Sequence, residues 1–209
     1  MRTIIDALLE GDSAASLAAA KQLQQTGISA EQIVNEGLEV AMQQLDDKCT
    51  VEGFNLLEIM LVGRAVSAVV NELYPEGGLP DKGRATFVIA TLEGDIHDLG
   101  KKIVKIVLLG KGYRVIDCGK DCPIETVVST AQRENASAVL VSGLITSIIP
   151  QVRKVRPALL ARGLSQVKIV AGGAALKQAS TTELNVDFVA ETAFDGVRYL
   201  EQIAQGVSQ

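Results

Sequence analysis

The 209-residue sequence predicts a bundle of helices followed by an α/β domain with a doubly wound, five-stranded parallel sheet. Two observations support this. Residues 1–75 show helix start and stop signals and no strand-like alternation, whereas short apolar runs alternate with amphipathic segments throughout 84–209. Prolines and glycines fill residues 75–83. We therefore expect domains at 1–75 and 84–209, joined by a linker at 75–83.

Four helices are expected in the N-terminal domain. The first ends at Gly11, the second begins at the cap Ser13 and stops at Gly27, and the third opens with the capping box Ser29–Gln32. The fourth is expected at about 54–73, where apolar residues recur at helical spacing.

Five strands, each followed by a helix, are expected in the second domain. Their apolar runs are short and nearly continuous, as in Ala138–Val141, which fits a sheet covered on both faces. We expect strands at 84–91, 113–118, 137–143, 167–171 and 187–190, and helices at 98–110, 123–134, 149–162, 174–180 and 194–205.

Composition excludes several classes of function. The formal net charge is −5 with no extended basic cluster, so neither nucleic acid nor a membrane surface is an expected partner. Three irregularly placed cysteines do not form a disulfide framework, and no apolar run is long enough to span a bilayer. The N-terminus lacks the apolar core of a signal peptide. We expect a cytoplasmic protein.

The only histidine, His97, lies where the first strand should meet its helix, and ligands bind at such strand ends in open α/β sheets. The loop lacks a phosphate-binding glycine motif and has Asp95-x-His97-x-x-Gly100 instead. On an extended loop Asp95 could hydrogen-bond the imidazole, as carboxylates do for metal-ligating histidines. Alternatively, Asp95 and Asp98 only cap the helix and His97 is solvated.

Two other chemistries use the same histidine. A zinc site could combine His97 with Cys118 and Cys122, but such sites need about four ligands. A hydrolase could combine His97 and Asp95 with a serine, but the nucleophile motif G-x-S-x-G is absent. The candidate serines are Ser142 and Ser147.

Two further stretches occur at expected strand ends. Ser142–Ser147 follows the third strand and Ala171–Ala175 follows the fourth. Their hydroxyl groups and glycines could admit a long ligand, although ordinary turn chemistry explains each stretch alone.

Together, Asp95-x-His97-x-x-Gly100, Ser142-x-Leu144 and Gly172-Gly173 resemble the cobalamin-binding signature of corrinoid proteins of the methionine-synthase and methyltransferase type. The helical half is similar to the cap bundle that precedes that module. The resemblance implies a flavodoxin-like (Rossmann-like) domain that binds cobalamin base-off, with the histidine as lower axial ligand of cobalt.

The resemblance also implies roles for individual residues. His97 would be the cobalt ligand, and Asp95 would hydrogen-bond it. Gly100 would form the tight turn beyond, and both Asp98 and Gly100 would be among the residues that bind the cofactor. The channel for the displaced nucleotide tail would be lined by Ser142, Leu144, Thr146, Ser147, Gly172 and Gly173.

The chain departs from the family pattern at two points. Methionine synthases place a serine two residues after the threonine to complete a relay with the aspartate and histidine, but Ile148 stands here and the nearby hydroxyl is Ser147. The family's Phe-Leu-Pro at the start of the fourth helix is replaced by Phe54-Asn55-Leu56-Leu57.

By this resemblance the chain is a methyl-carrying subunit, with methylcobalamin in its working cycle. Separate donor and acceptor methyltransferases and a reductive activator are the expected partners. The sequence leaves the donor open among methanol, methylamines, betaine-like compounds and aryl methyl ethers. Alternatives are the small subunit of an adenosylcobalamin mutase and a cobalamin-dependent sensor.

Overall fold

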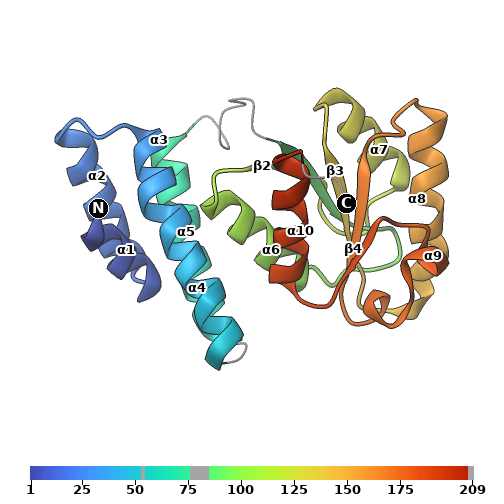
Figure 1. Cartoon of the computed structure of the whole chain (residues 1–209), viewed down its shortest axis with the longest axis horizontal. Coiled ribbons are helices and arrows are strands. Elements are labelled where there is room, and N and C mark those ends of the chain that lie inside the picture. The colour runs from blue at the N-terminus through green and yellow to red at the C-terminus, as the bar shows by residue number, and fades with distance from the viewer. Residues whose placement is uncertain (53–54, 76–84, 207–209) are drawn as a thin grey trace. The chain divides into compact units, whose positions relative to one another are not determined.

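The chain folds into two compact units. A computed structural model describes residues 1–52, 55–75 and 85–206 (Figure 1). The first unit comprises residues 1–82 together with 106–114, and the second comprises 83–105 and 115–209. Because 106–114 includes the end of a helix that starts in the second unit, one helix contributes to both units.

The first unit is helical. A capping box opens the third helix as predicted: Ser29 Oγ accepts from the Gln32 N–H, and the Gln32 side chain accepts from the Ser29 N–H. Its elements are α1 (Arg2–Leu9), α2 (Ser13–Gln25), α3 (Ala30–Ile33), the π-helix η1 (Val34–Leu38), α4 (Glu39–Glu52) and α5 (Leu56–Leu73).

Two details of this unit differ from the sequence prediction. The cap of α2 is Asp12 rather than Ser13, because Asp12 Oδ1 accepts from the N–H groups of Ala14 and Ala15. The helix expected from Ser29 onward contains the π-helical turn η1, where a Cβ on Gly37 would lie 3.3 Å from Ile4 Cγ2. Glycine thus leaves room for α1 against the widened turn.

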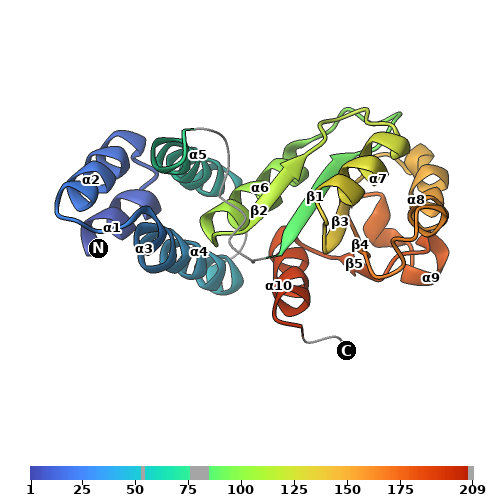
Figure 2. The same cartoon turned by 90° about the horizontal axis from the view of Figure 1, so that it is seen from above.

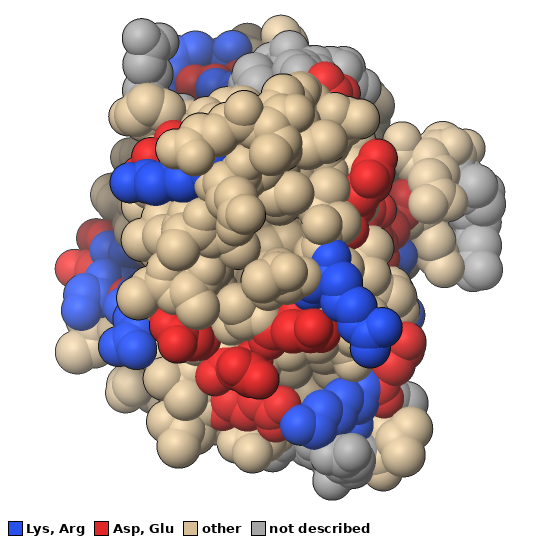
Figure 3. Space-filling model, turned by 90° about the vertical axis from the view of Figure 1, so that its left-hand side faces the viewer, with Lys and Arg blue, Asp and Glu red and all other residues tan. Residues whose placement is uncertain are grey.

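The surface of the molecule seen in Figure 3 carries both signs of charge. Acidic and basic residues intersperse along its lower part, and a broad area above them holds neither. Within the described residues, none of the helices combines the length and apolarity that spanning a lipid bilayer requires.

The second unit is the predicted parallel sheet with helices on both faces (Figure 2). The strand order is β2–β1–β3–β4–β5, the flavodoxin-like order, which confirms the predicted fold class. Its elements are β1 (Thr86–Thr91), α6 (Leu99–Gly110), β2 (Arg114–Asp117), α7 (Ile124–Arg133), β3 (Ala138–Ser142), η2 (Thr146–Ile148), α8 (Ile149–Ala161), β4 (Lys168–Gly172), η3 (Leu176–Gln178), α9 (Thr181–Leu184), β5 (Phe188–Ala190) and α10 (Ala193–Ala204).

Alternate residues of the central strands build the core on one face of the sheet. Val88 and Ala90 of β1 join Val139 and Val141 of β3 in a buried cluster that includes residues of α7 and α8. Since successive strand residues point to opposite faces, the residues between them face the other side. All six residues of β1 are buried, as the continuous apolar run predicted.

The short helix expected at 174–180 is instead two elements. Residues 176–178 form the 3₁₀ turn η3, and Ser180 starts α9 with a second capping box that pairs it with Glu183. The Ser180 Oγ accepts a hydrogen bond from the Glu183 N–H. This cap begins a new helix rather than extending the preceding turn.

Asp187 ties β4 to the start of β5. Its Oδ2 accepts from the Ile169 N–H at 2.7 Å and from Arg156, and its Oδ1 lies 3.5 Å from Lys168 Nζ. Burial tends to raise the pKa of this carboxyl, but the Ile169 N–H and the Arg156 guanidinium outweigh it and hold the pKa below its usual value.

Acid should therefore weaken the second unit through Asp187. A depressed folded-state pKa contributes stability that is full above the unfolded-state value of about 4 and is lost as the pH falls through the folded-state value. We expect Asp187→Asn to lower stability at pH 7 and to flatten its decline below about pH 4. Urea unfolding between pH 7 and pH 3 measures this, and parallel pH profiles for the two proteins would contradict it.

Candidate functional site

The site lies at the carboxyl ends of the neighbouring strands β1 and β3. The chain continues from β1 to β2 on one side of this pair and from β3 to β4 on the other. In this order the crevice beyond the carboxyl ends of β1 and β3 is the switch point at which ligands bind. The loop after β1 carries Asp95 and His97, and the loop after β3 carries Leu144. Thr91, Ser142 and Gly172 end their strands in one register row. The three sequence motifs therefore meet at one edge of the sheet.

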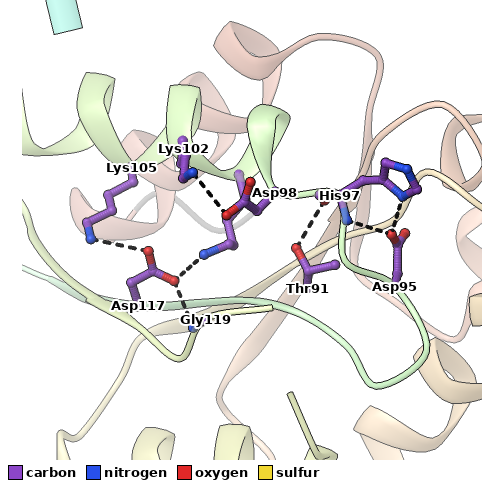
Figure 4. Close-up of polar contacts among 9 residues, drawn as sticks. Thr91, Asp95, His97, Asp98, Lys102, Lys105, Asp117 and Gly119 are labelled. Atoms are coloured by element: carbon purple, nitrogen blue, oxygen red, sulfur yellow. Dashed lines mark hydrogen bonds and ion pairs between the residues drawn. The ribbon is translucent and has the colours of Figure 1, made fainter. Parts of the chain in front are cut away.

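Asp95 and His97 form the hydrogen-bonded pair that the motif suggested (Figure 4). Asp95 Oδ1 accepts from the His97 backbone N–H at 2.9 Å and lies 2.7 Å from the ring Nδ1. A carboxylate that takes the backbone N–H two residues later forms an Asx turn, which explains why the loop bends here. The imidazole is thereby oriented by a fixed partner.

The second oxygen of Asp95 is held by the backbone of the β3 loop. Asp95 Oδ2 accepts from the Leu144 N–H at 2.7 Å, and the residue is completely buried. Burial tends to raise the pKa of Asp95, but the N–H groups of His97 and Leu144 together with the imidazole lower it below its usual value. Asp95 is therefore held as a carboxylate.

The outer part of the imidazole faces solvent. The His97 side chain is 51% exposed, and among the described residues its ring has a hydrogen-bond partner only at Nδ1. Nε2 is thus left as an outward-facing nitrogen. The buried Thr91 hydroxyl donates to the His97 carbonyl at 3.4 Å, which adds a contact from the end of β1.

Three exposed apolar residues belong to the segments that carry the Asp95–His97 pair and its backbone partner. Ile96 is 62% exposed, Leu99 is 43% exposed and Leu144 is 47% exposed. Ile96 and Leu99 flank the histidine segment, and the Leu144 N–H is bonded to Asp95. Exposed apolar residues beside an oriented imidazole suit a ligand with a large apolar surface.

Asp98 and Gly100 lie at the start of α6 rather than against the imidazole. Asp98 Oδ2 lies 3.1 Å from Lys102 Nζ, and its carbonyl accepts from the Lys102 N–H. A Cβ on Gly100 would meet only Ser142 Oγ, at 3.9 Å. Gly100 therefore leaves open space next to the end of β3.

The remaining predicted residues line the edge beside the pair. Thr146 and Ser147 lie exposed in η2, and Gly173 follows β4 with a φ of +105°. The Gly143 N–H donates to the Gly172 carbonyl at 2.9 Å, so the β3 and β4 loops run together. Among the described residues, neither Ser142 nor Ser147 has a hydrogen bond to His97, which removes the contact that a serine hydrolase needs.

The described part of the chain also offers little to a zinc ion. It contains no group of three or more histidine, cysteine, aspartate and glutamate side chains placed to hold a metal. Burial raises the pKa of the Cys118 thiol, and it raises that of the Cys122 thiol to about 11, so both favour the neutral form rather than the thiolate that binds zinc.

Sequence reasoning missed four residues of this site. Thr91, Ile96 and Leu99 contact or flank the histidine segment, and Asp121 bonds to its backbone. Thr91 had a signal, since it is a polar residue at the end of an apolar strand. Asp121 had none, because its partner lies 27 residues away in sequence.

Comparison with known proteins now identifies the family. Two family models, each described as a B12 binding domain, match residues 85–198 and 1–74. Dimethylamine corrinoid protein 2 from Methanosarcina mazei is 32% identical over 206 residues, which cover 97% of this chain and 96% of that protein.

Solved structures of cobalamin proteins match the fold of this chain. A chain in the methanol:cobalamin methyltransferase complex from Methanosarcina barkeri matches with a TM-score of 0.86 at 25% identity, covering 99% of this chain and 80% of that one. A cobalamin-binding protein from Desulfitobacterium hafniense, 23% identical with a TM-score of 0.74 and 97% of both chains covered, shares the fold. The chain therefore belongs to the B12-binding family of corrinoid proteins associated with methyltransferase systems, and its cofactor is a corrinoid.

Proposed function

We propose that this protein is a methyl carrier that binds its corrinoid base-off with His97 as the lower axial ligand. It would pass a methyl group between methyltransferases on separate chains. The observation that carries the proposal is the Asp95–His97 pair, whose second ring nitrogen faces outward. When bound, a corrinoid would supply the cobalt centre on which the methyl group is carried.

The donor set fits such a cofactor. A metal-ligating imidazole uses one nitrogen for the metal and donates the proton on the other to a carboxylate. Asp95 Oδ1 is that acceptor at 2.7 Å from Nδ1, so it selects the tautomer with Nε2 unprotonated. The exposed side chains of Ile96, Leu99 and Leu144 would contact the macrocycle around this nitrogen.

The proton of Nδ1 stays between His97 and Asp95 in this arrangement. The far oxygen of Asp95 accepts from the Leu144 N–H, where methionine synthases are expected to use a serine hydroxyl. A backbone amide holds the carboxylate in place but does not deliver a proton at neutral pH. In the protein without corrinoid, proton exchange at the pair would therefore pass through the solvent-exposed imidazole.

The polar edge next to the pair would hold the displaced nucleotide tail. The hydroxyls of Ser142, Thr146 and Ser147 would hydrogen-bond it, and the bare backbone at Gly172 and Gly173 would allow its close approach. Asp98 and Gly100 would shape the helix start beside it, through the Lys102 contact and the open space at Gly100.

The methyl donor is proposed to be a methylamine, because relatives that match most of the chain are corrinoid proteins named for dimethylamine and trimethylamine. The donor and acceptor methyltransferases, and a reductive activator that restores the active oxidation state, would be separate proteins. The structural match in a methanol methyltransferase complex supports docking to a methyltransferase.

Methyl transfer between purified components tests the proposal. The protein is loaded with hydroxocobalamin, reduced with titanium(III) citrate, and mixed with a dimethylamine methyltransferase and dimethylamine. We expect the absorbance change of corrinoid methylation. A parallel reaction with a methanol methyltransferase and methanol should be slower by about tenfold or more, because each enzyme recognises its own carrier.

Two controls distinguish corrinoid binding from methyl transfer. Omitting the methyltransferase should leave the corrinoid unmethylated, which shows that substrate activation belongs to the partner. Failure to retain a corrinoid under reducing conditions would contradict the proposal, as would methylation by none of a panel of methylamine, methanol and aryl methyl ether systems.

A further inference from the structure

A segment that no motif singled out supports the loop carrying the histidine. Residues 117–122, here called the buttress segment, begin at the last residue of β2 and run beside the end of β1. The Thr91 N–H donates to the Gly119 carbonyl, the Cys122 N–H donates to the Thr91 carbonyl, and the Glu93 N–H donates to the Cys122 carbonyl, at 2.9 to 3.0 Å. The segment thus extends the β1–β2 pairing into the histidine loop.

Asp121 binds the backbone of Gly94 and Asp95, which lie three and two residues before the histidine. Its N–H donates to the Asp95 carbonyl at 3.0 Å, and its Oδ1 accepts from the Gly94 N–H at 2.8 Å. Asp121 adopts a left-handed φ of +51°, which is uncommon for a residue other than glycine. This conformation brings both the amide and the carboxylate of one residue to the same loop.

The other flank of the histidine is anchored to the same segment. Lys101, in the first turn of α6, is only 2% exposed and its ammonium bonds to Asp117. Asp117 also accepts from the Gly119 N–H at 2.9 Å and from Lys105 at 3.2 Å. The His97 loop is therefore fixed on both sides by one neighbouring segment.

We propose that Asp121 is a positioning residue that sets the orientation of His97 through the backbone of Gly94 and Asp95. The inference rests on the proposed role of His97 as the cobalt ligand and adds a residue that would not itself touch the cofactor. Because both Asp95 oxygens are already bonded, moving its backbone alters the carboxylate that orients the imidazole. The side-chain bond to Gly94 prevents that movement.

Three variants separate the side-chain bond from the backbone conformation. Asp121→Asn keeps a side-chain oxygen for the Gly94 N–H and tolerates the left-handed φ. Asp121→Gly keeps the conformation without strain but removes the acceptor. Asp121→Ala loses the acceptor and strains the backbone. Asn185→Gly is a matched control, since Asn185 has a left-handed φ of +57° at the end of α9 and is away from the site.

The first measurement uses the protein without corrinoid. Nitrogen-15 NMR of labelled histidine reports His97 alone, because the chain has a single histidine. At one fixed pH, the wild type and Asp121→Asn should show the tautomer protonated at Nδ1. Asp121→Gly should shift the tautomer ratio by about threefold to tenfold, the effect of one hydrogen bond, while Asn185→Gly should not.

The second measurement uses the corrinoid-loaded protein. Splitting of the cobalt(II) electron paramagnetic resonance signal by an axial nitrogen measures the fraction with histidine bound. Asp121→Gly should lower the ratio of bound to free histidine by about threefold to tenfold, with rescue in Asp121→Asn. Wild-type values for Asp121→Gly in both measurements would overturn the proposal, as would equal shifts in Asn185→Gly. If the wild-type signal lacks nitrogen splitting, the proposed function fails and the NMR measurement still decides the role of Asp121.

Discussion

His97→Gly is expected to abolish nitrogen ligation of the cobalt and to lower corrinoid retention by about tenfold or more. The reason is chemical: glycine has no donor, and no other histidine exists in the chain to replace it. In wild-type protein grown with nitrogen-15 histidine, the threefold splitting of the cobalt(II) resonance lines by nitrogen-14 should become twofold. The glycine variant should show neither pattern.

The fold should survive this substitution. The His97 side chain is about half exposed, so its removal chiefly loses the bond to Asp95, which costs about 1 kcal/mol. Added imidazole should restore nitrogen splitting in the glycine variant, and His97→Gly/Asp95→Asn should need more imidazole than His97→Gly. Twofold splitting that persists in the glycine variant grown with nitrogen-15 histidine would contradict ligation by His97. Threefold splitting in the wild type grown with the same label would contradict it as well.

The sequence allowed prediction of the pair but not of what holds it. Asp95 and His97 stand two residues apart, so local geometry alone brings their side chains together. The third partner of the relay was left open, because Ile148 stands where a serine was expected. In the structure the far oxygen of Asp95 accepts from the Leu144 N–H, and a backbone donor leaves no trace in residue identity. Asp121 escaped prediction for a related reason, since its bonds depend on chain topology.

In the fold, too, features set by residue identity could be predicted, and features set by packing could not. The strands of the sheet were predictable from continuous apolar runs, because burial on both faces demands them. Capping boxes at Ser29 and Ser180 both exist, yet only the first was used to predict a helix start. The π-helical turn around Gly37 could not be predicted from periodicity, because one widened turn barely changes the spacing of apolar residues.

Gly173→Ala is expected to destabilise the second unit by about 4 kcal/mol. Two costs add. The φ of +105° is unfavourable for alanine, and the new Cβ would lie 2.5 Å from the Gly143 carbonyl oxygen. Gly143 cannot move away easily, because its N–H donates to the Gly172 carbonyl and its carbonyl accepts from the Ala175 N–H. Hydrogen exchange of peptides from β3 and β4 is the suitable measurement, since two units need not unfold in one step.

Gly163→Ala separates the two costs. Gly163 also has a positive φ, of +73°, but a Cβ there would meet nothing within 4 Å, so only the backbone cost of about 1 to 2 kcal/mol remains. The difference between the variants therefore measures the clash with Gly143. Because Gly143 precedes Leu144, whose N–H holds Asp95, the clash should also weaken histidine ligation, whereas Gly163→Ala should leave it intact. Equal destabilisation by the two substitutions would contradict the clash with Gly143, and unchanged histidine ligation in Gly173→Ala would contradict its effect on the Asp95–His97 pair.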